Sequence, residues 1–185
     1  MEAALALPPG RTSIIAVATE TPAAVLGLAG YAGSSARLCG LMWGAEDLAG
    51  ALGASSNRTD GRYRAPFELA RNLCLLGAAA AEVMAIDAVY TDFADGEGLR
   101  AEASAARIDG FRAKAAIHPD QCAIVNAAFE PSQAERHWAR AVLDALAATP
   151  AGVASLDGRM IDRPHEVQAR RILGLAAPGG PMGSG

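Results

Sequence analysis

"RLCGLMWGAEDLAGALGA", residues 37–54, joins an apolar run to a short Ala- and Leu-rich segment through a glycine and two adjacent acids. Residues 37–44 are apolar almost throughout, which is typical of a strand buried on both faces of a parallel sheet. Residues 46–54 predict a helix. The stretch is therefore a β/α unit, and Glu46 and Asp47 stand where its strand ends and its helix begins.

The same alternation of apolar run and helix recurs along the chain. Further strands are predicted at 12–20, 85–92 and 112–119, and helices at 22–32, 66–85, 98–110, 119–129, 131–148 and 163–176. Four β/α units make half of a (β/α)₈ TIM barrel, and the pattern alone equally allows a small open sheet. The predicted fold class is α/β.

Composition excludes several classes of protein. The chain has 185 residues and a net charge of −4, and it shows no basic cluster, so nucleic acid is not an expected partner. No run reaches the roughly 18 apolar residues of a membrane span, and the N-terminus lacks the basic start of a signal peptide. Cys39, Cys74 and Cys122 are widely spaced, which predicts reduced, buried thiols in a cytoplasmic protein.

Two acids follow neighbouring predicted strands. Glu20 ends the first strand and Asp47 follows the second. Each acid alone is explained by helix capping. Two carboxylates at adjacent strand ends would instead repel each other unless a cation lay between them, and oxygen ligands of this kind suit Mg²⁺. The residues therefore leave both a magnesium site and two caps open.

Several blocks of sequence resemble the citrate lyase β-subunit and malyl-CoA lyase family, which belongs to the HpcH/HpaI aldolase group. These blocks are "VATET", "LMWGAEDLAGALGA", "ARNLCLLGAAAAE", "AIDAVYTDFADGEGL", "GFRAKAAIHPDQCAIVNAAFEPS" and "GRMIDRPHEVQARRIL". The resemblance implies a Mg²⁺-dependent (β/α)₈ barrel, commonly trimeric, that cleaves or forms a carbon–carbon bond between an acyl-CoA and a 2-oxo acid.

The resemblance also implies roles for particular residues. Glu20 and Asp47 match the two metal ligands of the family. The backbone of Gly44, Ala45 and Glu46 matches the turn that receives the carboxylate of the 2-oxo acid. Asp162 matches an acid that reaches into the site of a neighbouring subunit in the malyl-CoA lyase branch, although it also suits an ordinary loop or cap position.

The match begins near the fifth strand of the family's barrel. We expect residues 1–148 to form the C-terminal half of a TIM-barrel lyase domain, 149–176 a helical lid or extension, and 177–185 a disordered tail. A half barrel leaves strand edges unpaired. The chain is therefore expected to be part of a longer product, to pair with a separate first half-barrel, or to pair with itself.

The expected function is that of a Mg²⁺-dependent acyl-CoA carbon–carbon lyase of the citryl-CoA or malyl-CoA type, working as a homo-oligomer. Two alternatives remain open: a truncated, non-catalytic fragment that needs a missing N-terminal half, and a class II aldolase that acts on free 2-oxo acids. His118, Lys114, Asp92 and Asp95 are interpreted as structural residues.

Overall fold

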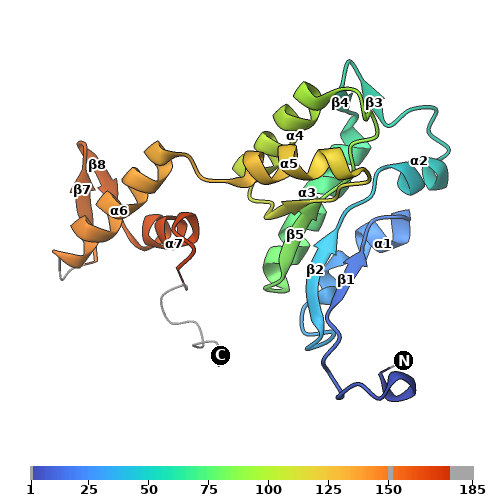
Figure 1. Ribbon diagram of the computed structural model, residues 1–185, viewed down its shortest axis with the longest axis horizontal. Helices are drawn as coiled ribbons and strands as arrows, with labels where there is room; N and C mark the ends of the chain where they lie inside the picture. Colours follow the sequence, from blue (N-terminus) through green and yellow to red (C-terminus); the bar gives the residue numbers. More distant parts are fainter. Residues whose placement is uncertain (1, 150–151, 176–185) are drawn as a thin grey trace. The chain divides into compact units, whose positions relative to one another are not determined.

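The computed structural model describes residues 2–149 and 152–175. The chain divides into two compact units, Met1–Phe129 and Glu130–Gly185 (Figure 1). The sequence places this boundary near residue 148, but the helix that precedes that residue packs with the C-terminal segments. The expected disordered tail at 177–185 lies outside the described residues.

Short helices and strands alternate along the described chain. The first unit contains η1 (Ala3–Leu5), β1 (Ile14–Val17), α1 (Pro22–Leu26), η2 (Leu28–Tyr31), β2 (Leu38–Met42), α2 (Glu46–Leu52), β3 (Arg58–Thr59), β4 (Arg62–Tyr63), α3 (Ala65–Ala80), β5 (Met84–Asp87), α4 (Gly96–Asp109), β6 (Ala113–Lys114) and α5 (Pro119–Phe129). The second unit contains α6 (Gln133–Ala147), β7 (Ala154–Leu156), β8 (Arg159–Ile161) and α7 (Arg163–Ile172).

A four-stranded parallel sheet organises the first unit. Its strands follow chain order, β1-β2-β5-β6, and each neighbouring pair is parallel. The register places Val17 beside Met42, and Asp87 beside Lys114. The predicted α/β class with a parallel sheet is confirmed, although β6 is much shorter than the predicted run because the chain leaves the sheet after Lys114 and α5 begins at Pro119.

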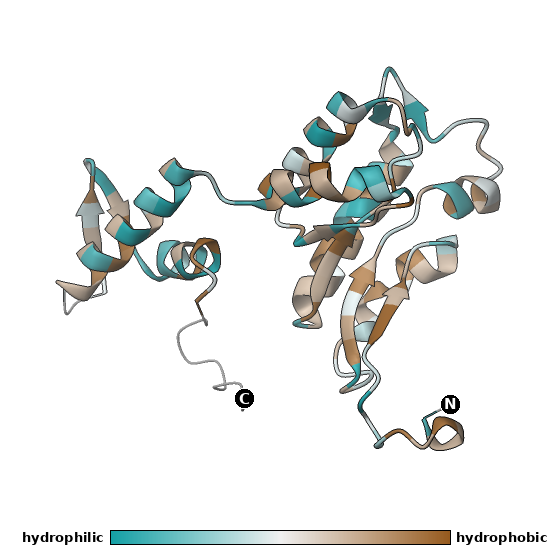
Figure 2. Cartoon of the chain, viewed as in Figure 1, coloured by the Kyte–Doolittle hydropathy of each residue, from teal (hydrophilic) through white to brown (hydrophobic). Residues whose placement is uncertain are grey.

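The two faces of this sheet differ in cover. Helix α3 packs on β2 and β5, and Leu41, Trp43 and Ala85 share one buried cluster with residues of α3. Ala16 of β1 is in register with Leu41 and packs against this cluster. Side chains alternate between faces along a strand, so Ile15 and Val17 of β1 point to the opposite face. They are 52% and 40% exposed, and β1 is predominantly hydrophobic in Figure 2. This chain therefore leaves part of an apolar sheet face uncovered.

Two short hairpins lie between the helices of the described chain. The strands β3 and β4 pair around Asp60-Gly61, and β7 and β8 pair around Asp157-Gly158. All four turn residues have positive φ, between 51° and 76°. Asp-Gly supports this backbone conformation in a two-residue hairpin turn. Neither hairpin was predicted from the sequence, although each Asp-Gly pair is a signal for a turn.

The second unit has its own small core. Ala139, Val142, Ile161 and Ala169 are buried between α6, β8 and α7. The helix α6 begins at a capping box in which Ser132 and Glu135 exchange side-chain and backbone hydrogen bonds. The described part of the segment expected as a helical lid or extension, 149–176, contains this hairpin and α7.

None of the described helices has the length and apolar character that crossing a membrane requires.

The expectation of buried thiols holds for Cys74, where burial raises the pKa of the thiol to about 12. It is wrong for Cys122, which is exposed, while Cys39 is half-buried.

Candidate functional site

A threonine ties together the loops that leave β1 and β2. The amide of Ala18 donates to the Met42 carbonyl over 2.8 Å and continues the sheet. The fully buried Thr19 then accepts a hydrogen bond from the Gly44 amide (2.8 Å) and donates from its hydroxyl to the Gly44 carbonyl (3.2 Å). Glu20 directly follows this clamp, so its loop is fixed to the turn that leads to Asp47. Thr19 was not predicted from the sequence, because a hydroxyl that bonds to a backbone group has no sequence motif.

The two predicted metal ligands are exposed. Glu20 stands in the loop after β1, and Asp47 lies in the first turn of α2. No hydrogen bond or ion pair joins either carboxylate to another described residue. Asp47 is not a helix cap, because the N-cap residue is Ala45. The capping interpretation therefore fails for Asp47, and its carboxylate is available to a ligand.

The donor set fits a hard cation that keeps part of its coordination for other ligands. Among the described residues no group of three or more His, Cys, Asp or Glu side chains is arranged to hold a metal. A cation at the predicted site would therefore have at most two carboxylate ligands from the described residues, Glu20 and Asp47. Mg²⁺ is commonly held by one or two carboxylates, with water and substrate oxygens completing its octahedron, which this pair of exposed carboxylates permits.

The turn between β2 and α2 presents backbone rather than side-chain donors. Ala45 is buried, and no side chain caps the helix start. The carboxylate of Glu46 points to the neighbouring hairpin, where its Oε1 accepts a hydrogen bond from Asn57 Nδ2 over 2.8 Å. The side chain of Glu46 thus has a partner within the chain, and the role that the resemblance implies for Gly44, Ala45 and Glu46 rests on their backbone.

Asp162 lies in the second unit as the N-cap residue of α7. Its Oδ1 is 2.7 Å from Nδ1 of His165, and its amide nitrogen is 3.2 Å from the same ring nitrogen. Both side chains are about one-third exposed. The cap position is what the ordinary interpretation of Asp162 predicted, and its partner His165 was not singled out from the sequence.

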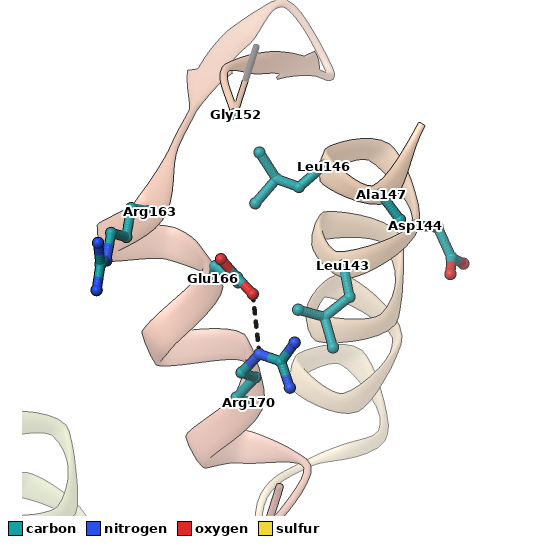
Figure 3. A pocket seen from close by; sticks show the side chains of 8 residues that line it. All are labelled: Leu143, Asp144, Leu146, Ala147, Gly152, Arg163, Glu166 and Arg170. Carbon is teal, nitrogen blue, oxygen red and sulfur yellow. Dashed lines mark hydrogen bonds and ion pairs between the residues drawn. The ribbon is translucent and has the colours of Figure 1, made fainter. Parts of the chain in front are cut away.

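A pocket in the second unit lies close to Asp162 and His165. It is lined by Leu143 and Leu146 of α6 and by Arg163, Glu166 and Arg170 of α7. Figure 3 shows the two leucines turned toward α7, where Glu166 and Arg170 form an ion pair with an N–O distance of 2.9 Å. Apolar side chains on one helix thus face a charged helix across this pocket.

The acids interpreted from the sequence as structural residues have hydrogen-bond partners within the chain. Asp95 is the N-cap of α4, where Oδ1 accepts from the Gly98 amide (2.8 Å) and Oδ2 accepts from the Tyr90 hydroxyl (2.6 Å). The bond from Tyr90 lowers the pKa of Asp95 and raises the pKa of Tyr90 to about 12. Asp92 accepts a hydrogen bond from the Ala94 amide within its turn.

A buried ion pair was not anticipated from the sequence. Asp87 is 1% exposed, and its Oδ2 is 2.8 Å from Nζ of Lys114, whose side chain is fully buried. The structural interpretation of Lys114 agrees with these contacts. Asp87 was missed, although an acid inside the apolar run "AIDAVY" was a signal for a buried charge that needs a partner.

The sequence model of the HpcH/HpaI aldolase/citrate lyase family matches residues 9–119. A citrate lyase subunit beta-like protein of Mycobacterium tuberculosis is 42% identical over 135 residues, which are 72% of this chain and 49% of that protein. A (3S)-malyl-CoA thioesterase of Cereibacter sphaeroides is 41% identical over 143 residues, 76% of this chain and 49% of that protein. The chain spans about half the length of these relatives.

Solved structures show the same relationship. CitE from Mycobacterium tuberculosis, in complex with magnesium, acetoacetate and coenzyme A, superimposes with a TM-score of 0.75 and 39% identity over 83% of this chain and 57% of that one. A citrate lyase from Burkholderia xenovorans superimposes with a TM-score of 0.77 over 96% of this chain and 58% of that one, but at 20% identity it supports the fold alone. The resemblance found in the sequence is confirmed.

Proposed function

Because this chain belongs to the HpcH/HpaI aldolase/citrate lyase family, we propose that it carries the metal site of a Mg²⁺-dependent lyase that cleaves an acyl-CoA into a smaller acyl-CoA and a 2-oxo acid. The observation that carries the proposal is that two exposed carboxylates, Glu20 and Asp47, follow the two segments that Thr19 joins. Mycobacterial structures with magnesium, and with acetoacetate and coenzyme A or with oxaloacetate, support the choice of ligands.

Glu20 and Asp47 would hold the cation in this proposal. When bound there, Mg²⁺ supplies Lewis-acid polarisation of the carbonyl of the 2-oxo acid. The turn of Gly44, Ala45 and Glu46 would bind the carboxylate of that acid through the amides of Ala45 and Glu46, because the Gly44 amide already donates to Thr19. Amides at the start of a helix are suited to this because they have no partner within the helix. The buried Thr19 would keep the two loops in register.

Asp162 would handle the proton. Cleavage removes a proton from the substrate hydroxyl, breaks the bond to the α-carbon of the acyl-CoA, and returns a proton to that carbon. A carboxylate can serve as the acid/base group, and His165 would orient it through the 2.7 Å contact. Following the family resemblance, we assign Asp162 to the site of a neighbouring subunit in a homo-oligomer.

The parallel sheet would form four consecutive units of a (β/α)₈ barrel. Two observations support this arrangement: β1 and β6 are the outer strands of the sheet, and the face that carries Ile15 and Val17 is apolar yet exposed. In a closed barrel this face would point to the packed interior. Further β/α units, from the same longer product or from a separate chain, would then cover it.

Thioester hydrolysis is a second candidate, which the similarity to (3S)-malyl-CoA thioesterases favours. The same carboxylates would hold the metal, and water would attack the thioester instead of the carbon–carbon bond being broken. The two reactions differ in their products. A lyase leaves the thioester intact and releases a 2-oxo acid, whereas a thioesterase releases the free thiol of coenzyme A.

The test is a product assay with the purified chain and Mg²⁺. Malyl-CoA, methylmalyl-CoA, citryl-CoA and free 4-hydroxy-2-oxo acids are supplied separately, and glyoxylate, oxaloacetate, pyruvate and free thiol are measured. Release of a 2-oxo acid from an acyl-CoA, abolished by EDTA and restored by Mg²⁺, supports the lyase. Turnover of the free acids alone indicates a class II aldolase. No turnover of any substrate by the folded chain indicates a non-catalytic fragment.

A further inference from the structure

A network of ionic hydrogen bonds crosses the first unit beside the proposed site. Nζ of Lys114 donates to Asp87 Oδ2 (2.8 Å), to the Ala88 carbonyl (2.7 Å) and to Glu102 Oε1 (2.8 Å). An ammonium group has three donors, so every proton of Lys114 is used. Asp87 Oδ1 accepts from Trp43 Nε1 (2.6 Å) and from Arg71 Nε (3.1 Å). These bonds tie β5 and β6 to α3 and α4.

The charges in this network balance. Its members are three acids and three bases, joined by N–O contacts of 2.7–3.1 Å: Asp87, Glu102, Asp109, Lys114, Arg58 and Arg71. Burying a charge is costly unless it is paired and hydrogen-bonded. A complete network of this kind holds each member in one geometry, because moving one member leaves another unpaired.

Arg58 links this network to the hairpin β3–β4. Arg58 Nη2 is 2.7 Å from Glu102 Oε2, and its Nη1 donates to the Gly61 carbonyl over 2.8 Å. The guanidinium lies 3.6 Å from the centre of the Tyr63 ring, and that ring meets Trp43 edge-on. Arg58 therefore fastens both strands of the hairpin to α4 and to the sheet.

The residue that precedes the hairpin contacts the first residue of α2. Asn57 precedes Arg58 and donates from Nδ2 to Glu46 Oε1, which belongs to the first residue of α2. A continuous set of contacts thus runs from Lys114 through Glu102 and Arg58 to the hairpin, and from Asn57 to Glu46. Asp47 is the residue that follows Glu46.

We infer that Asn57 and Arg58 are positioning residues: the hairpin, anchored on Glu102, fixes the first turn of α2 and with it Asp47 and the backbone amides of Ala45 and Glu46. This inference rests on the proposed function only for what that turn binds. The mechanical link itself can be tested without any substrate.

Hydrogen exchange in the full chain tests the link. In Asn57→Ala, two hydrogen-bonded amides should exchange about fivefold faster, the change expected on losing one hydrogen bond near the surface: that of Gly44, which donates to Thr19, and that of Ala49, which donates to the Ala45 carbonyl. In Arg58→Met the same two amides should also exchange faster, because the hairpin loses its anchor on Glu102. Amides of β5 and α7 should keep their wild-type rates in Asn57→Ala.

The hairpin offers a matched control. Arg62 is exposed, and no described side-chain contact involves it, so Arg62→Met should leave exchange at the Gly44 and Ala49 amides unchanged. If Arg58→Met unfolds the chain, Asn57→Ala decides the outcome. Unchanged exchange at these two amides in folded Asn57→Ala, or equal acceleration in Arg62→Met, would overturn the inference.

A binding measurement separates this inference from the proposed function. With Mg²⁺ present, oxaloacetate should bind the wild-type chain and Arg62→Met equally, and bind Asn57→Ala about fivefold more weakly. Failure of the wild type to bind oxaloacetate would count against the proposed function and leave the exchange test intact. If the wild type, Arg62→Met and Asn57→Ala all bind oxaloacetate with equal affinity, that result would count against the positioning role.

Discussion

Acidic residues at two places in the first unit have opposite surroundings. Asp87, at the end of β5, is buried and accepts hydrogen bonds from Trp43, Arg71 and Lys114. Glu20 and Asp47, after β1 and β2, are exposed, and no described residue bonds to their carboxylates. The buried carboxylate is fully occupied by the protein, whereas the exposed pair is available to a ligand. Position at a strand end is shared, so the presence of partners is what distinguishes a structural acid from a candidate ligand.

The largest effect is expected at the buried region. Lys114→Met removes the cation between Asp87 and Glu102 and leaves both carboxylates without it. Breaking a buried pair costs about 3–5 kcal/mol of unfolding free energy, which chemical denaturation at neutral pH would measure. Arg100→Met, which removes an exposed arm of a pair with an N–O distance of 3.9 Å, is the control and should change stability by less than about 0.5 kcal/mol. A cost below about 1 kcal/mol for Lys114→Met would mean that the network is not what holds β5, β6 and α4 together.

Substitution of Asp47, one of the two exposed acids, should lower turnover and leave the unfolding free energy nearly unchanged. Asp47→Asn should lower Mg²⁺-dependent turnover by about a hundredfold or more, because loss of a residue that only hydrogen-bonds to a metal ligand already costs about ten- to a hundredfold. Its unfolding free energy should stay within about 0.5 kcal/mol of the wild type, since no described group loses a partner. Turnover with each confirmed substrate and denaturation curves measured on the same preparations would show this separation. A stability loss without a loss of turnover would reverse the assignment.

The comparison also bears on what the sequence predicts. The four strands and their helices were predicted correctly in order because apolar runs and helical segments are local patterns. The pairing of Asp87 with Lys114 joins residues 27 apart in sequence and depends on the register of β5 against β6. Local patterns do not fix that register. The exposure of Ile15 and Val17 was likewise invisible, because it depends on what covers the second face of the sheet.

At the site, the prediction depended on how each residue acts. Glu20 and Asp47 were selected by their places after adjacent strands, which the parallel order of β1 and β2 supports. Thr19 was overlooked because a clamp made by a hydroxyl and a backbone group has no sequence motif. The boundary after Phe129 was also missed, since α6 is an amphipathic helix that fits either unit until its packing against α7 is known.

Asp162 extends the comparison to the second unit, because it is both a cap and a proposed acid/base group. Asp162→Asn should lower turnover by about a hundredfold, the lower part of the range for general acid–base catalysis, and should cost at most about 1 kcal/mol of stability. Ser132→Ala is the matched control, since it removes the cap of α6 and should cost a similar amount of stability without changing turnover. Full turnover by folded Asp162→Asn would leave Asp162 as a cap only.

The smallest effect is expected at Tyr90 and Asp95. The Tyr90 hydroxyl holds the pKa of Asp95 below its usual value of 3.8. A carboxyl with a lowered pKa in the folded state stabilises the fold above its unfolded pKa, and this contribution is lost as the pH falls through the folded pKa. Tyr90→Phe should therefore raise the pKa of Asp95, as followed by NMR titration of its carboxyl carbon. An unchanged pKa would assign the shift to the Gly98 amide instead.

The central claim, that Glu20 and Asp47 are ligands while Asp87 is structural, is tested most directly by titrating Mg²⁺ into the full chain by calorimetry. We predict one Mg²⁺ per chain for the wild type and for Glu97→Gln, whose carboxylate is 91% exposed on α4, and no measurable binding for folded Asp47→Asn or Glu20→Gln. Mg²⁺ binding that persists in both of those variants, or that is absent from the folded wild type, would contradict the account.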